Sequence, residues 1–308
     1  MNKALLLSLA LFCCGLQMQA QTMTEDEIMA KLNEASALDN AKKTAEALDA
    51  FLLIGKNMEQ QRTEVEHQIY VYCQAKACMC YETLKRYKEA YLLAKKLMSG
   101  SLTEKEKKDV AHLYAMNGYM YATSFMHGNN RQLVKARTIL EGIMPYADGK
   151  VREYALPKIP LSWYFEAAEY HLSQQYDKAL ACYQNALKGF MELRKTDDEI
   201  SVLRHIAEIK GTLYDGIGSE NAYKQALYLS RQTGKSDAQM EILKELWKIG
   251  KTIGDVQQAQ AYAASIDSLV DATSDLQTKY TYYNQKGNEA RDLGQYGIAE
   301  QWYLRGKD

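Results

Sequence analysis

Residues 176–190 read YDKALACYQNALKGF, and this stretch decides the fold. Its apolar side chains recur at intervals of three and four residues, at Tyr176, Ala179, Leu180, Tyr183, Ala186, Leu187 and Phe190. Side chains with that spacing share one face of an α-helix. The stretch is therefore predicted to be an amphipathic helix that buries one stripe and exposes the rest.

The same stripe recurs along the chain. It begins again at Tyr87, at Val256 and at Tyr296. The step from Val256 to Tyr296 is half the step from Tyr176 to Val256. A helical unit is thus repeated with a period of about 40 residues.

Helix-start signals recur with nearly the same period. The capping pattern Ser/Thr-x-x-Glu/Gln satisfies two free amides at a helix N-terminus. It occurs at Thr24/Glu27, Ser101/Glu104, Thr196/Glu199, Ser236/Gln239 and Ser274/Gln277. Between such a box and the next stripe there is room for one more helix and a tight turn, such as Gly254-Asp255 or Gly294-Gln295. Each unit is predicted to be helix–turn–helix.

The large, small and aromatic positions of this unit resemble the tetratricopeptide repeat pattern. One copy has Trp163, Ala167, Tyr170, Tyr176, Ala179, Tyr183 and Ala186. A second has Cys78, Tyr81, Tyr87 and Ala90, and a third has Gly287, Gly294, Tyr296, Ala299 and Tyr303. The copies around Ala47, Ala136, Ala226 and Ala259 are degenerate. The resemblance covers nearly all of residues 24–308 and implies an all-α, right-handed superhelical solenoid of about seven antiparallel helix pairs.

Composition agrees with an all-α chain. The 308 residues include only 3 prolines and 18 glycines, too few turn residues for a β-sandwich or barrel. The formal net charge is −1 and the pI is about 6.6, so the sequence has no basic footprint for nucleic acid and no polybasic membrane patch.

The first twenty residues are predicted to be a signal peptide. Lys3 precedes an apolar run from Ala4 to Gly15, and a Met-x-Ala cleavage site ends at Ala20. Lipidation at Cys13 or Cys14 is the alternative, although no small residue precedes either cysteine. We expect a cleaved, exported chain, periplasmic in a bacterium, with no membrane span in its mature part.

All three prolines, Pro145, Pro157 and Pro160, lie in one segment that interrupts the repeats. We predict N-terminal repeats at residues 21–145, a proline-containing inter-repeat loop at 146–160 and C-terminal repeats at 161–308. The alternative for the loop is a hinge between two superhelical halves.

Signatures of catalysis, metal binding and cofactor binding are missing from the sequence. It contains no P-loop, no dinucleotide fingerprint and no nucleophile elbow, so we predict that the protein is not an enzyme and takes no cofactor. Cys73, Cys78 and Cys80 are placed on one helix and Cys182 elsewhere, and we predict neither a disulfide nor a metal site. The five histidines, at 67, 112, 127, 171 and 205, are dispersed over different repeats.

Binding is the function that the resemblance implies. In tetratricopeptide-like repeats, ligands contact recurring positions on the first helix of each pair, along a concave groove. Here these positions are Tyr164, Ala168, His171, Arg204, Glu208, Lys244, Lys248, Lys251, Asn284, Asn288 and Arg291. Upstream, Tyr121 and Phe125 add an aromatic stretch.

The lysines suggest the character of the partner. Lys244, Lys248 and Lys251 share one helix face and predict a basic groove for an acidic, extended protein or peptide segment. Asn288 falls where carboxylate-clamping members of the family carry a peptide-binding Asn, but the flanking lysines of that clamp are not reproduced. The alternative is that the lysines pair with Glu241 and Glu245 on a solvated face.

The last predicted helix bears Trp302 and Tyr303, and no polar capping helix follows it. This favours, as a second hypothesis, the sensory input region of a larger signalling protein, a histidine kinase or a transcriptional regulator. The main prediction is an exported scaffold that presents a groove to a protein or peptide.

Overall fold

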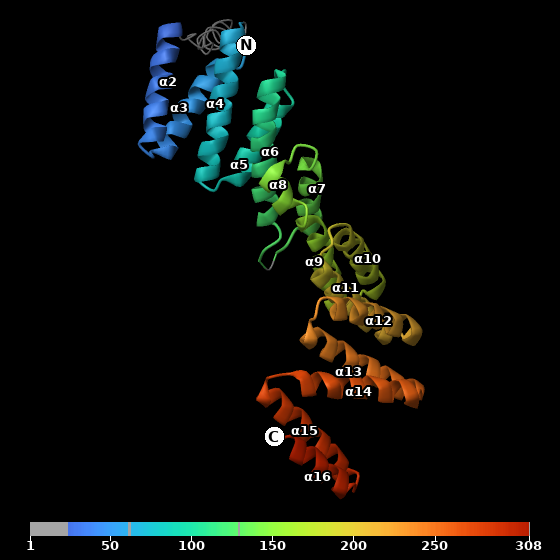
Figure 1. Ribbon diagram of the computed structural model, residues 1–308. Helices are drawn as coiled ribbons and strands as arrows, with labels where there is room; N and C mark the ends of the chain where they lie inside the picture. Colours follow the sequence, from blue (N-terminus) through green and yellow to red (C-terminus); the bar gives the residue numbers. More distant parts are fainter. Residues whose placement is uncertain (1–23, 61–62, 129, 308) are drawn as a thin grey trace, which may run out of the picture. The chain divides into compact units, whose positions relative to one another are not determined.

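The computed structural model describes residues 24–60, 63–128 and 130–307. In these ranges the chain is helical apart from turns and short connections, and it contains no strand (Figure 1). It divides into two compact units at Ile159 and Pro160. The predicted signal peptide at residues 1–20, with Cys13 and Cys14, lies outside the described residues.

The N-terminal unit consists of three helix pairs and a short helix. Its helices are α2 (Glu25–Asn40), α3 (Thr44–Asn57), α4 (Glu64–Thr83), α5 (Tyr87–Met98), α6 (Glu104–Ser124), α7 (Leu133–Ile143) and α8 (Gly149–Ala155). From α2 to α7 each helix packs on the next one along the chain. Phe51, Ile54 and Ala77 are fully buried between the first pairs.

The C-terminal unit consists of four helix pairs. Its helices are α9 (Lys158–Leu172), α10 (Tyr176–Glu192), α11 (Thr196–Thr212), α12 (Gly216–Gln232), α13 (Ser236–Ile253), α14 (Val256–Ala272), α15 (Leu276–Asp292) and α16 (Tyr296–Arg305). From α10 to α16 each helix packs on the next, and α9 joins the same core through Ala167. The predicted all-α solenoid of about seven helix pairs is confirmed in the described residues.

The period found in the sequence is visible in the helix boundaries. The second helices of the four C-terminal pairs begin at Tyr176, Gly216, Val256 and Tyr296, and these starts are evenly spaced, one period apart. Positions separated by one period are therefore equivalent in this unit, and a side chain on one first helix has a counterpart on the next.

Small residues lie where the two helices of a pair cross, as predicted. Ala90 is fully buried, and Cys78 Sγ donates a hydrogen bond to its carbonyl oxygen at 3.7 Å. In the pair α11/α12 the direction is reversed, since Ser219 Oγ of the second helix donates to the Ala207 carbonyl oxygen of the first at 2.7 Å. Close approach of the two backbones therefore depends on small side chains at these crossings.

In most of the helix pairs, the turn after the first helix contains a residue whose backbone adopts the left-handed conformation, with positive φ. Gly254 and Gly294 have φ values of 80° and 74°, which confirms the two turns predicted there. The same conformation is taken by residues with a Cβ in other pairs, at Lys42, Lys85, Gln174 and Tyr214. Each turn is closed by an amide that bonds five residues back, as from Gln175 to Tyr170 at 2.9 Å.

The predicted capping boxes are only partly correct. At α2 the Thr24 amide donates to Glu27 Oε2 at 2.8 Å, and the Glu27 amide donates to Thr24 Oγ1 at 3.3 Å, so this box is confirmed. The prediction missed the boxes Thr63/Glu66 and Thr103/Glu106, which begin α4 and α6. Ser101 lies two residues before the N-cap of α6 and does not cap it.

In the C-terminal unit the predicted boxes are wrong. Lys195 and Lys235 occupy the N-cap positions, so Thr196 and Ser236 are already the first helical residues and their side chains do not cap. The tight turns that precede α11 and α13 set these starts, with Arg194 and Gly234 at positive φ. At α15 the cap is Asp275 rather than Ser274.

The segment 146–160 is not the loop that was predicted. It contains α8 and the first turn of α9, with Pro157 in the short connection between these helices. Pro160 lies in the first turn of α9, where the missing amide leaves no helical hydrogen bond unmade. Its ring is buried against α10, because a Cβ at Gly189 would lie 2.7 Å from Pro160 Cβ.

The cysteines of the described chain are packing residues. Cys73, Cys78, Cys80 and Cys182 are all buried, and none of the four forms a disulfide. Burial raises the pKa of the Cys73 and Cys78 thiols to about 12, which keeps them protonated at neutral pH. Neither sulfur is therefore a thiolate nucleophile.

Within the described ranges, none of the helices combines the length and the apolar composition that crossing a membrane requires.

Candidate functional site

A cavity of about 570 Å³ opens on the first helices of the C-terminal unit. We call it the groove cavity. It is lined by Tyr164, Ser201, Arg204, His205, Glu208, Tyr223, Glu241, Lys244, Glu245 and Lys248. Tyr164 comes from α9, the next residues come from α11 and α13, and Tyr223 alone comes from a second helix, α12.

The repeat explains how these side chains meet. On α11 the lining positions follow an i, i+3, i+4, i+7 pattern that starts at Ser201, and on α13 the same pattern starts at Glu241. The two sets are one period apart, so they occupy equivalent places on consecutive first helices. Tyr164, Arg204 and Lys244 form one such row across α9, α11 and α13. The structure therefore brings these three predicted groove residues together on the lining of one cavity.

The groove cavity is not basic, contrary to the prediction. Its basic lining residues are Arg204, Lys244 and Lys248, and its acidic lining residues are Glu208, Glu241 and Glu245. Glu208 was expected in the groove and Glu241 and Glu245 were expected only as alternative partners of the lysines, yet all three carboxylates line the cavity beside the cations. The lining is charge-balanced.

Two of the cations form ion pairs with these glutamates. Arg204 contacts Glu241 Oε2 at 2.5 Å across the two helices, and Lys248 Nζ lies 2.7 Å from Glu245 Oε1 within α13. Both pairs are largely exposed, so each contributes less than about 1 kcal/mol to stability. The alternative prediction, pairing of the lysines with Glu241 and Glu245, holds for Lys248 with Glu245.

Tyr164 and His205 line the groove cavity toward α9, and the rings of Tyr183 and His171 lie next to His205. Tyr164 Oη lies 3.0 Å from His205 Nε2, and the Tyr183 ring stacks on His205 with centroids 5.3 Å apart. The ring of His171 lies 6.1 Å from that of His205. Burial lowers the pKa of His205 and raises that of Tyr164, so both groups are uncharged at neutral pH.

A smaller cavity, of about 170 Å³, adjoins the groove cavity. Lys244 and Lys248 line both, and its other lining residues are Trp247, Ala263, Ile266, Tyr282, Gln285, Lys286 and Glu289. Its floor is apolar, from Ile266 and the rings of Trp247 and Tyr282. Lys251 Nζ lies 4.5 Å above the Trp247 ring, so this predicted groove lysine packs on the aromatic rim.

The remaining predicted residues do not line either cavity. Asn288 Oδ1 accepts a hydrogen bond from the Tyr303 hydroxyl at 2.7 Å, which uses its side chain within the last helix pair. Arg291 bonds to the neighbouring Asp292 at 3.1 Å. Asn284 is half-buried on α15.

Tyr121 and Phe125 belong to the N-terminal unit, at the end of α6. Their ring centroids are 4.7 Å apart in an edge-to-face contact. Lys135 Nζ of α7 lies 4.3 Å from the centroid of Phe125. The two aromatic rings therefore pack on each other, and Lys135 packs over the ring of Phe125.

The sequence prediction missed several lining residues, and it misplaced two histidines. Ser201 and Tyr223 were not predicted, whereas Glu241 and Glu245 were predicted only as partners of the lysines. Ser201 follows from Arg204 by helical spacing, so its signal was present. His171 and His205 were taken as dispersed, yet they meet beside Glu208 because consecutive first helices are adjacent. A ring nitrogen of each histidine and a carboxylate oxygen of Glu208 lie within 4.8 Å of one another.

No family model matches the sequence, and no curated protein matches it. Solved structures align with the chain at low similarity. Aspartyl phosphate phosphatase F from Bacillus subtilis aligns with a TM-score of 0.42 and 11% identity over 93% of this chain and 75% of its own. The C-terminal part of a TPR repeat-containing protein from Cytophaga hutchinsonii has a TM-score of 0.33 and 15% identity over 79% and 96%. BtubC from P. vanneervenii has a TM-score of 0.36 and 12% identity over 74% and 91%.

Proposed function

We propose that the protein is an exported scaffold whose groove cavity binds an extended segment of a protein partner. The observation that supports this is a cavity of about 570 Å³ on equivalent positions of α9, α11 and α13. Cavities of about 300–1,000 Å³ are of the size that holds a ligand. The α13 side chains that line it lie on a different face of that helix from the core residues Ile242 and Leu246.

The charges indicate where a partner would be anchored. Within the described ranges Arg204 and Lys248 each have a glutamate partner, and Lys244 forms no ion pair. Lys244 also lines both the groove cavity and the smaller one beside it. A carboxylate of the partner at Lys244 would gain a charge-assisted hydrogen bond without displacing an existing pair. The proposed segment is therefore acidic at this point, although the cavity as a whole is neutral.

The smaller cavity supplies the apolar part of the proposed contact. Trp247 and Tyr282 present half-buried rings there, and aromatic side chains of this kind dominate binding energy in protein interfaces. An extended segment with an acidic residue at Lys244 would place the side chain two residues away on the same face. We expect that side chain to be apolar and to enter the smaller cavity.

The test is selection of binding peptides from a random library on the purified protein, followed by affinity measurements on the best sequence. Lys244→Glu should weaken binding by about tenfold or more, since it replaces an attraction with a repulsion. Lys188→Glu is the matched control. It makes the same charge change on an exposed position of α10, outside the cavities, and should leave affinity unchanged. Equal affinities for both variants would refute binding at Lys244.

Export is tested by the mass of the protein recovered from a bacterial host. A periplasmic product that begins at Gln21 would support cleavage after Ala20. A product modified on Cys13 or Cys14 would instead indicate a lipoprotein. The sensory input role stays a second prediction, and it would use the same groove to detect its stimulus.

A further inference from the structure

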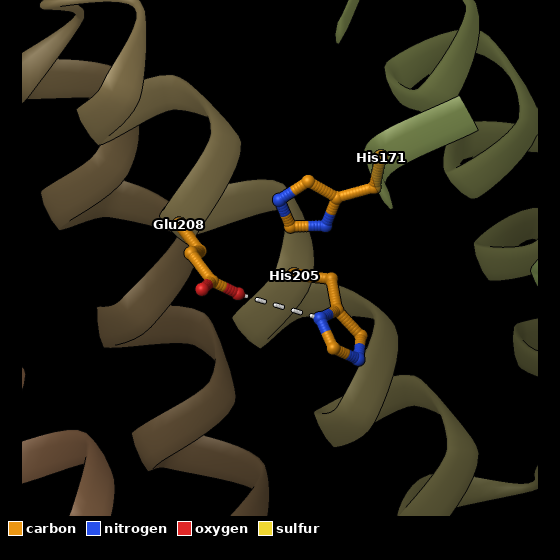
Figure 2. Close-up of side chains that lie close together, drawn as sticks. All are labelled: His171, His205 and Glu208. Carbon is orange, nitrogen blue, oxygen red and sulfur yellow. Dashed lines mark ion pairs between the residues drawn. The ribbon is translucent and has the colours of Figure 1, made fainter. Parts of the chain in front are cut away.

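We propose that His171, His205 and Glu208 form a binding site for a divalent transition metal such as Zn²⁺. Figure 2 shows His205 and Glu208 on successive turns of α11, and His171 reaching the same space from α9. This site goes beyond the proposed binding of a protein segment and does not depend on it.

The three side chains are spaced for a shared ion. Two ligand atoms on a tetrahedral zinc, each bonded at about 2.0–2.2 Å, lie about 3.3 Å apart. His205 Nδ1 and Glu208 Oε2 are 3.5 Å apart (Figure 2), already close to that separation. One ligand atom from each of the three residues lies within 4.8 Å of the other two. A short rotation of the His171 side chain would therefore bring its ring nitrogen to bonding distance from the shared ion.

His205 presents a free lone pair at this place. Its Nδ1 is buried and forms no hydrogen bond within the described residues. Its other nitrogen, Nε2, is 3.0 Å from the Tyr164 hydroxyl. When Nε2 carries the proton and donates it to Tyr164, Nδ1 is left as an acceptor that faces Glu208. Metal-binding histidines are held in this way, with the second ring nitrogen bonded to an oxygen.

In this tautomer of His205, two acceptors lie against each other. His205 Nδ1 faces the carboxylate of Glu208, which is an exposed residue. A separation of 3.5 Å is long for a hydrogen bond between a ring nitrogen and a carboxylate oxygen. A cation between them would satisfy both groups. Arg204, the residue before His205 on α11, is bonded to Glu241.

The ligand types indicate the metal. Two imidazoles and one carboxylate suit zinc and its neighbours in the first transition row, whereas magnesium and calcium prefer oxygen ligands alone. Sites with three protein ligands keep a further position open. Because His205 and Glu208 line the groove cavity, that position faces the cavity. The ion would also join the first helices of two consecutive pairs.

The other cysteines and histidines of the described chain that were considered as metal ligands do not form a comparable site. The thiols of Cys73 and Cys78 stay protonated because burial raises their pKa to about 12. His112 lies 3.4 Å from Asp148 on an exposed surface of the N-terminal unit. Among the described residues, only His171, His205 and Glu208 bring three such ligand atoms within 4.8 Å of one another.

The test is calorimetric titration of the chelator-treated protein with ZnCl₂, repeated with CoCl₂ to record visible absorption from bound cobalt. We expect one equivalent of each metal to bind. Glu208→Gln and His171→Ala should each weaken zinc binding at least tenfold and reduce the cobalt absorption, because each removes a ligand. Circular dichroism of both variants should match that of the parent.

Two variants serve as matched controls. Glu192→Gln, on an exposed position of α10, and His112→Ala should bind zinc as the parent does. His205→Ala is a poorer test, since it also removes the ring that stacks on Tyr183. The proposal is overturned if the protein shows no saturable zinc binding. It is equally overturned if Glu208→Gln and His171→Ala bind zinc as tightly as the two controls.

Discussion

Helices α11 and α13 hold equivalent places in consecutive pairs, yet their exposed faces carry different chemistry. Ser201, Arg204, His205 and Glu208 on α11 correspond to Glu241, Lys244, Glu245 and Lys248 on α13. The first set packs histidine against aromatic rings, and the second leaves a lysine without an ion pair in the described chain. The repeat therefore fixes the positions of these side chains, and the residue at each position decides what the surface can bind.

The buried sides of the two helices differ as well. Ala207 of α11 is fully buried at the crossing with α12, where it contacts Ser219. The equivalent residue of α13 is Trp247, which is too large for a crossing and lines the smaller cavity instead. The close approach to α14 moves one turn along, to Gly250, where a Cβ would lie 3.3 Å from Ala259. The position of a crossing can thus shift between pairs without changing their period.

The largest expected effect comes from placing a large side chain at position 207 of α11, where the equivalent position of α13 already carries Trp247. Ala207→Leu forces a bulky side chain into the crossing of α11 and α12, and we expect it to lower the free energy of unfolding by about 2–3 kcal/mol. Urea denaturation at neutral pH measures this. Ala261→Leu makes the same change on an exposed position of α14 and should leave stability nearly unchanged. Equal effects would contradict a tight crossing at Ala207.

A smaller effect is expected from the hydrogen bond at the same crossing. Ser219→Ala removes the buried bond from Oγ to the Ala207 carbonyl oxygen. The free energy of unfolding should fall by about 1 kcal/mol. Ser265→Ala removes an exposed bond within α14 and serves as the control, with a much smaller expected change. If the two variants are equally stable, the bond between the helices contributes nothing.

Lowering the pH should reduce the stability of the fold through His205 on α11, which has no histidine counterpart on α13. Burial lowers the pKa of His205 below its ordinary value of 6.5. As the pH falls through about 6.5, the unfolded chain therefore takes up a proton at His205 before the folded chain does, and stability falls. Urea midpoints at pH 7.5, 6.5 and 5.5 should decrease less for His205→Gln than for the parent. Parallel decreases would mean that His205 does not contribute.

The smallest effect is expected at the ion pair between the two helices. Arg204→Gln breaks the contact with Glu241 on a largely exposed surface. The free energy of unfolding should therefore change by less than about 1 kcal/mol. The small change should shrink further in about 1 M salt, where exposed charges are screened. A loss of several kcal/mol would show that the two faces are bound together far more tightly than their exposure indicates.

Much of the fold could be predicted because it depends on short-range spacing. The apolar stripe, the period and the small residues at Cys78 and Ala90 are all properties of neighbouring sequence, and the structure agrees with them. The helix starts after tight turns could not be predicted in this way. Arg194 adopts positive φ although it is not glycine, so the turn that moves the N-cap of α11 to Lys195 left no sign in the sequence.

The sequence could predict which side chains share one helix face, and it could not predict which side chains of different helices meet. Arg204 and Lys244 line the same cavity because they occupy equivalent positions of the repeat, which the sequence spacing gives. The pairing of Arg204 with Glu241 and the approach of His171 to His205 depend on the distance and rotation between neighbouring helices. Those quantities are set by packing at crossings such as Ala207 and Gly250, which differ from pair to pair.

The most direct test of the account is photo-crosslinking from the groove cavity in the host cell. A benzophenone amino acid at Ser201 lies on the lining of the cavity, and one at Gln184 lies on an exposed position of α10 outside it. If the first helices of the C-terminal unit present the binding surface, position 201 should give a discrete cross-linked product with a partner protein and position 184 should not. Equal products from both positions, or a product from position 184 alone, would contradict it.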